Sequence, residues 1–120
     1  IESNYDGVEW QFNSPVKGKY EVKIGYAAGS FDGSKKAKPS FITTTAEVGL
    51  TRNADFSHYP VSTMNELEYT GWDTVSVSEQ AVEIELDEGK NFIYCLKLDS
   101  VDCGIFQIDY IDIRLTETLD

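Results

Sequence analysis

The chain has 120 residues, which is enough for one domain with a radius of gyration of roughly 14 Å and too few for two domains. Its 10 Lys and Arg against 21 Asp and Glu give a formal net charge of −11. So negative a chain repels phosphate, which argues against nucleic acid and membranes as partners. Apolar residues make up 41% of the chain, and no apolar run approaches the roughly 20 residues of a membrane span. The composition therefore predicts a single soluble domain over residues 1–120.

Apolar and polar residues alternate with a period of two along much of the chain, as in half-buried β-strands. In chain order the expected strands cover residues 7–13, 19–27, 40–50, a segment within 59–70, 73–79, 81–87, 91–98 and 105–115. Turn-forming residues separate several of them, at 15–18, 29–33 and 87–89. No segment has helical periodicity. About eight short antiparallel strands predict an all-β fold, a β-sandwich of jelly-roll type.

The apolar positions of the last expected strand change face around Tyr110. Phe106 and Ile108 follow one period of two, whereas Ile111 and Ile113 follow the other. A β-bulge, or a strand buried on both faces, explains such a change.

Two longer stretches have the composition of loops, and binding residues on rigid sandwiches usually lie in loops. Residues 28–38 contain two Gly and three Lys, and residues 51–71 contain His58, two Tyr and several acids. The sequence therefore predicts that a binding site uses one or both of these loops.

The aromatic residues divide into expected core and expected surface. Tyr20, Tyr26 and Tyr94 fall on inward strand positions, and Trp10 lies within a strand beside apolar residues. Trp72 differs, because it stands between a glycine and an aspartate where a long loop meets a strand. Its indole either stays open to solvent, where it can stack on the apolar face of a sugar ring, or closes the end of the sandwich.

Classical nucleophilic triads and zinc sites are disfavoured by what the chain lacks. His58 is the single imidazole, so Ser–His and Cys–His triads and His-rich zinc sites have no support. Two carboxylates could cleave a glycosidic bond. With 21 acids, however, some pair satisfies any required spacing, and acids solvated on outward strand faces are the simpler interpretation. We therefore expect a protein that is not an enzyme.

The two cysteines, Cys95 and Cys103, form neither a disulfide framework nor a metal cluster. If the strands around them form a hairpin, the two side chains fall on opposite faces. Only a corner where the chain passes between two sheets would bring them within bonding distance.

Four segments resemble, in order, the carbohydrate-binding modules of families 6, 35 and 36. The segments are GKYEV leading to GYA, GWDT, VEIEL with EGKNFI, and Gly104 followed by IDYIDI, which together extend over residues 18–113. Those families are calcium-binding β-sandwiches attached to secreted polysaccharide-degrading enzymes. The resemblance implies a secreted, extracellular, non-catalytic module. It would bind a plant cell-wall polysaccharide, a β-glucan or hemicellulose, and target an attached catalytic domain to it.

The resemblance also implies a sugar site at the loop end of the sandwich. In those families a Trp at the position of Trp72 faces an aromatic residue from an N-terminal loop, here Tyr5. An Asn before the last strand bonds sugar hydroxyls, and Gln107 holds that position with one more methylene. Asp102 and Asp73 would help to orient the sugar. A second site on a concave sheet face, used by some members, stays open.

Calcium is also implied by the resemblance, because those modules open with a strand whose two Glu help to bind the ion. Few residues precede Gly7 here, which fits a shortened first strand, a chain from which that strand has been removed, or a divergent family. In the first case Glu2 is the remaining candidate, and Asp109 is a second oxygen ligand. The alternative is that both acids carry no metal.

Two other functions remain compatible with a sandwich, because the fold hosts many functions. One is a structural or adhesion module that makes protein contacts at the cell surface, and the other is a small glycan-processing enzyme. For the carbohydrate module, a uronate ligand is disfavoured by the charge of −11, unless calcium or Lys35, Lys36 and Lys38 offset that charge.

Overall fold

The computed structural model describes residues 7–28, 36–48, 59–97, 104 and 106–119. Within them the regular structure consists of eight strands, all paired antiparallel. The strands are β1 (Gly7–Ser14), β2 (Gly18–Ala27), β3 (Ser40–Thr44), β4 (Val61–Thr63), β5 (Ser76–Val77), β6 (Val82–Leu86), β7 (Gly89–Leu96) and β8 (Gln107–Thr118). The all-β prediction is confirmed.

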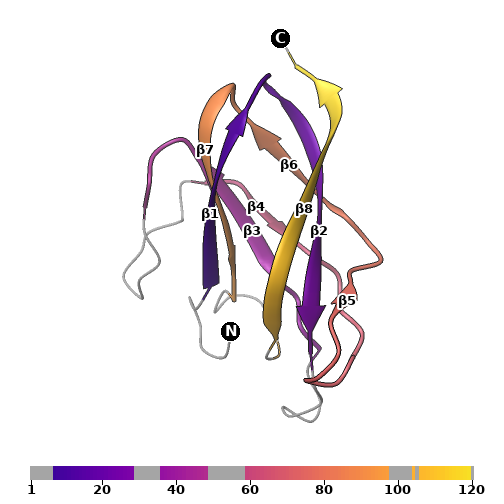
Figure 1. The fold of residues 1–120 in the computed structure, drawn as a ribbon. Helices are drawn as coiled ribbons and strands as arrows, with labels where there is room; N and C mark the ends of the chain where they lie inside the picture. Colours follow the sequence, from indigo (N-terminus) through magenta and orange to yellow (C-terminus); the bar gives the residue numbers. More distant parts are fainter. Residues whose placement is uncertain (1–6, 29–35, 49–58, 98–103, 105, 120) are drawn as a thin grey trace.

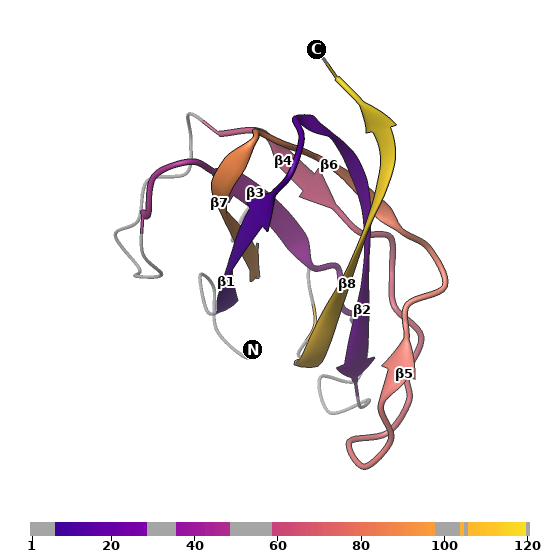
Figure 2. The same ribbon diagram turned by 45° about the horizontal axis from the view of Figure 1, so that its top comes forward.

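The strands form two four-stranded sheets that face each other as a β-sandwich (Figure 1). Sheet A has the order β1-β7-β3-β4, and in sheet B the long strand β2 pairs with β8 along one edge and with β5 and β6 along the other. The turned view separates the layers, with β1 and β7 in one and β2 and β8 in the other (Figure 2). This strand order does not by itself establish jelly-roll connectivity, which stays a prediction.

Strands β5 and β6 behave as one interrupted partner of β2. Between them lies Ser78, which is buried. Two hydrogen bonds between Ser78 and Ile24 of β2 take the place of regular strand pairing there. The Ser78 hydroxyl accepts from the Ile24 amide at 3.0 Å, and the Ser78 amide donates to the Ile24 carbonyl at 2.9 Å. The chain can therefore bend away from the sheet at residues 79–81 while Ser78 keeps the Ile24 backbone paired.

Strand β8 contains the bulge predicted from its change of face. Gly25 pairs with Tyr110, whereas the next residue, Tyr26, pairs with Ile108. Asp109 is thus the extra residue, and the strand turns its apolar side chains back toward the core on both sides of it.

The core lies between the sheets. It is built from alternate residues of β2, β6 and β7 with Phe41 of β3, and Trp10 packs against it. Tyr20, Tyr26 and Tyr94 are buried, as expected. The radius of gyration is 14.1 Å. A second, smaller cluster covers the outer side of sheet A, where Val48 and Tyr59 pack on four buried residues: Ile42, Phe92, Tyr94 and Leu96.

Two predicted strands are shorter than expected, which corrects the sequence interpretation. Strand β3 ends at Thr44 rather than 50, because the Thr44 hydroxyl donates to the Ala46 carbonyl at 2.6 Å and the chain bends there. The expected strand 73–79 reduces to Ser76–Val77. The β-branched residues around it are exposed, so no buried face extends the pairing.

The expected strands 91–98 and 105–115 do not form a hairpin, since β7 belongs to sheet A and β8 to sheet B. Their connection is therefore a crossing between sheets. Cys95 is fully buried in β7, and Cys103 lies outside the described residues, so the disulfide is untested.

Candidate functional site

Trp72 lies on a turn that is attached to the end of β2. The Ala28 carbonyl accepts hydrogen bonds from the amides of Thr70 and Gly71, at 2.8 and 3.2 Å. Gly71 has φ of +84°, a left-handed conformation that residues with a Cβ rarely adopt. The Trp72 side chain is exposed at 37%, so part of its surface is accessible to a ligand.

The pairing of β2 with β8 brings further predicted residues to the same end of sheet B. Gln107 is the first residue of β8 and pairs with Ala27. Ala27 is followed by Ala28, whose carbonyl holds the Trp72 turn. Asp73 follows Trp72 on that turn, and both Asp73 and Gln107 are exposed. The remaining predicted sugar contacts lie outside the described residues: Tyr5 and Asp102.

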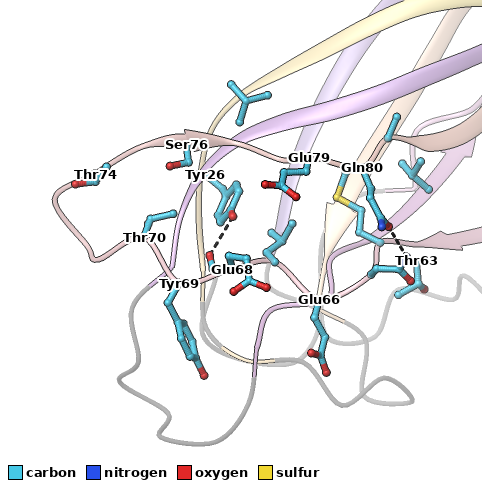
Figure 3. Close-up of a pocket in the computed structure, with 16 residues that line it drawn as sticks. Tyr26, Thr63, Glu66, Glu68, Tyr69, Thr70, Thr74, Ser76, Glu79 and Gln80 are labelled. Carbon is cyan, nitrogen blue, oxygen red and sulfur yellow. Dashed lines mark hydrogen bonds between the residues drawn. The ribbon is translucent and has the colours of Figure 1, made fainter.

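A cavity of about 400 Å³ lies beside this turn. Its walls are residues 63–70 and 74–82, and Tyr26 of β2 stands between them (Figure 3). Trp72 does not line the cavity, but the threonines two residues on either side of it do. The lining is rich in hydroxyl and amide groups, which belong to Thr63, Asn65, Thr70, Thr74, Ser76 and Gln80.

The wall formed by residues 63–70 is held in place although most of it has no regular structure. The Met64 amide donates to the Pro39 carbonyl at 2.8 Å, and the Leu67 amide donates to the Ala37 carbonyl at 2.9 Å. The side chains of Met64 and Leu67 are buried in the core, at 5% and 6% exposure. These anchors leave the intervening polar side chains directed outward on a fixed backbone.

Tyr26 joins the cavity to sheet B. Its hydroxyl donates to the Glu68 carbonyl at 3.0 Å. Burial raises the pKa of Tyr26, and the negative charges of Glu68 and Glu79 raise it further. The hydroxyl therefore stays protonated at neutral pH and keeps its hydrogen bond to the opposite wall.

Two of the three carboxylates that line the cavity are paired with lysines. Glu68 binds Lys36, with Nζ to Oε2 at 3.1 Å, and Glu66 lies 3.9 Å from the Nζ of Lys38. The hydrogen bond that Lys36 donates to Glu68, and then the negative charge of Glu68, raise the pKa of Lys36. The third carboxylate, Glu79, has no ion-pair partner in the part of the chain that the structure describes. Figure 3 shows Glu79 extending toward Tyr26, whereas Glu66 points away from the cavity.

Sequence reasoning found one wall of the cavity and missed the other. Residues 63–70 fall within the stretch 51–71 that was expected to bind a ligand, but Ser76, Glu79 and Gln80 were placed in or next to an ordinary strand. The available signal was the polar run 78–80 between two β-branched segments. It marks a break in a strand, and it does not distinguish a cavity wall from a solvated bend.

The two outer sheet faces differ in what they offer a ligand. Sheet A carries a buried cluster across its middle, including Phe92 and Tyr94. On the outer side of sheet B the ring of Tyr110 lies directly over Gly25, so close that a Cβ on Gly25 would overlap it. Tyr110 is still 41% exposed, which makes it the aromatic residue available on that face among those described.

A second cavity, of about 560 Å³, lies where β6 approaches β3 and β4. Two hydroxyls in its lining already have backbone partners. Thr43 donates to the Glu85 carbonyl at 3.2 Å, and Ser62 donates to the Glu83 carbonyl at 3.0 Å. These bonds join the two sheets, so these two hydroxyls have a structural role.

The described residues do not by themselves form a metal site. Asp109 is exposed on the bulge of β8, and Glu2 lies outside the described residues. No three groups among Asp, Glu, His and Cys gather closely enough to hold a metal in the described ranges. Calcium needs six to eight oxygen ligands, so Asp109 alone cannot hold the ion.

Comparison with models of known protein families finds no match for this chain. Comparison with curated proteins finds no significant match. Among the described residues there is no helix long and apolar enough to cross a membrane.

Proposed function

We propose that this domain is a non-catalytic carbohydrate-binding module. Its ligand is a plant cell-wall polysaccharide of the β-glucan or hemicellulose type. The module is secreted, and it holds an attached catalytic domain near that polysaccharide, which raises the local substrate concentration. The similarity of its sequence segments to families 6, 35 and 36 motivates this assignment.

One observation carries the proposal: a hydroxyl- and amide-lined cavity lies beside an exposed tryptophan at one end of a rigid sandwich. Sugar rings present an apolar face, which an indole can cover, and a rim of hydroxyls, which need donors and acceptors. In the proposed complex Trp72 supplies the apolar contact, with Tyr5 opposite it. Asp73, Gln107 and Asp102 orient the ring, and Gln80 and Thr74 bond the adjoining sugar in the cavity.

Binding, rather than hydrolysis, is favoured by the state of the cavity carboxylates. Glycosidases of the usual kind need two carboxyl groups at a defined separation, one free to donate a proton and one free to attack or activate water. Here Glu66 and Glu68 are paired with Lys38 and Lys36. Only Glu79 is left without such a partner in the described part of the chain.

The test is affinity electrophoresis through gels that contain soluble β-glucans, xylans and mannans, followed by titration calorimetry with the oligosaccharides of any positive gel. We expect retardation in one or two gels. Gln80→Ala should lower the affinity, because it removes an exposed amide from the cavity lining. Gln11→Ala removes an exposed amide from β1 of the other sheet and should leave the affinity unchanged. Equal migration in all gels would refute the proposal.

The rival function, a structural or adhesion module, is favoured by a different observation. Val77, Gly25 and Tyr110 are in register across three strands of sheet B, and the side chains of Val77 and Tyr110 are 50% and 41% exposed. An apolar stripe of this kind suits a protein contact. Uniform migration in every gel, together with capture of a partner that is lost in Tyr110→Ala, would select this function.

Calcium is part of the proposal, with Glu2 and Asp109 as ligands. An ion that binds only the folded state stabilises it by RT ln(1 + [L]/Kd), which is about 2.7 kcal/mol at one hundred times Kd. A chelator should therefore lower the melting temperature, and calcium should restore it. An unchanged melting temperature, with no metal detected in the purified protein, would remove calcium and leave the sugar-binding proposal untouched.

A further inference from the structure

The lining of the 400 Å³ cavity contains three glutamates and, among the described residues, no lysine, arginine or histidine. Two of these glutamates are balanced by Lys36 and Lys38, which lie outside the lining. Glu79 has no such balance. Its charge also reaches Tyr26, where it helps to raise the pKa of the hydroxyl. The cavity therefore holds one uncompensated negative charge among hydroxyl and amide groups.

That charge should discriminate between ligands by their own charge. Two like charges a few ångströms apart repel, and the repulsion grows as bound sugar displaces water from between them. An ammonium group at the same place would instead form a charge-assisted hydrogen bond. A neutral hydroxyl can donate to the carboxylate at little electrostatic cost.

We propose that Glu79 is the specificity-determining residue of this cavity and that it selects neutral and amine-bearing sugars against uronates. The inference rests on the proposed function, because it assumes that the cavity holds sugar. It places the selectivity in one side chain rather than in the net charge of −11. The proposal therefore predicts that the module binds stretches of a β-glucan or hemicellulose that contain no uronate.

The experiment uses three β-1,4-linked tetrasaccharides that share a gluco backbone and differ in charge: cellotetraose, the tetramer oxidised to glucuronic acid at every ring, and the glucosamine tetramer. Affinities are measured by calorimetry at pH 6 and low salt for the parent chain and for Glu79→Gln. In the parent we expect the order amine, neutral, uronate from tightest to weakest. In Glu79→Gln the uronate should bind about three- to tenfold more tightly, the amine correspondingly less, and cellotetraose within about twofold.

Glu88→Gln is the matched control, because it changes the net charge by the same amount in the exposed β6–β7 turn at the opposite end of β2. It should leave the order and the ratios unchanged. The inference would be overturned if the affinities for the charged tetrasaccharides changed equally in Glu79→Gln and Glu88→Gln, or did not change in Glu79→Gln. In either case, binding of cellotetraose would still support the proposed function. Failure of all three tetrasaccharides, and of every polysaccharide gel, would remove the proposed function and this inference with it.

Discussion

Asn91 fixes the turn between β6 and β7 from inside the protein. Its side chain is 2% exposed and makes three hydrogen bonds. Oδ1 accepts from the Asp87 amide at 3.1 Å, and Nδ2 donates to the carbonyls of Asp87 and Gly89 at 2.8 and 3.0 Å. Gly89, with φ of +95°, allows the chain to reverse around this amide.

We expect Asn91→Ala to lower the free energy of unfolding by about 2 to 3 kcal/mol, because the truncation removes three partly buried hydrogen bonds that hold the turn. Urea denaturation followed by tryptophan fluorescence measures the change. Asn13→Ala, at an exposed position of β1, should differ from the parent by less than about 0.5 kcal/mol. A similar small change for Asn91→Ala would show that water or a rearranged turn replaces the amide.

Substitution of Trp72 distinguishes a binding role of its side chain from a structural role. If its indole is a stacking platform, Trp72→Ala should lower the affinity for the polysaccharide at least tenfold, about 1.4 kcal/mol. It should then lower the free energy of unfolding by less than the roughly 3 to 5 kcal/mol of a buried tryptophan. Trp10→Ala, on a side chain that packs against the core, should show the reverse: a larger loss of stability and an unchanged affinity. A folded Trp72→Ala chain that binds as tightly as the parent would move the site to Tyr110 on sheet B.

At the scale of the elements, the close approach of Tyr110 to Gly25 links β8 to β2. Since a Cβ on Gly25 would overlap the Tyr110 ring, Gly25→Ala should lower the free energy of unfolding by about 1 to 3 kcal/mol. In a Tyr110→Ala background the same change should be neutral or stabilising, because alanine loses less backbone entropy than glycine in a strand. A double-mutant cycle in urea measures the coupling. Additive effects would mean that the ring moves aside without cost.

The elements show how far sequence reasoning reaches. The period of two identified every strand that buries a regular face, such as β2 and β6, and the change of face in β8 predicted its bulge. Strand ends were less predictable, because β3 stops at a hydroxyl-to-carbonyl bond of Thr44 and β5 at a break made by Ser78. Such local bonds leave no trace in the hydropathy pattern.

The candidate site was predictable only in part, for a related reason. The position of Trp72 between a loop and a strand left two possibilities, an exposed indole or one that closes the end of the sandwich, and its 37% exposure is known only from the structure. The cavity beside it depends on three distant parts of the chain, namely Tyr26, residues 63–70 and residues 74–82. Hydrogen bonds from Met64 and Leu67 to residues 37–39 set its shape, and no spacing within one segment encodes them.

At the scale of the whole molecule, the net charge of −11 makes stability depend on pH. Self-repulsion among the acids weakens the folded state at neutral and alkaline pH. One identified contribution is local: Glu47 lies beside Glu9 of β1, and the hydrogen bond with Glu9 and its charge raise the pKa of Glu47 above the ordinary value of 4.5. A carboxyl whose pKa is raised on folding binds a proton more tightly in the folded state. The folded state therefore gains stability as the pH falls toward that pKa and loses it as the pH rises.

We therefore expect the melting temperature to be higher at pH 5 than at pH 8, until other carboxylates and their surface ion pairs protonate at lower pH. Glu47→Gln should raise the melting temperature at pH 8 and reduce the difference between the two pH values, because glutamine keeps the hydrogen bond and removes the repulsion. Glu88→Gln removes the same charge from another turn and should have a smaller effect at pH 8. Differential scanning calorimetry of the three proteins decides the matter: equal melting temperatures for Glu47→Gln and Glu88→Gln at pH 8 would assign the pH dependence to the overall charge rather than to the Glu9–Glu47 contact.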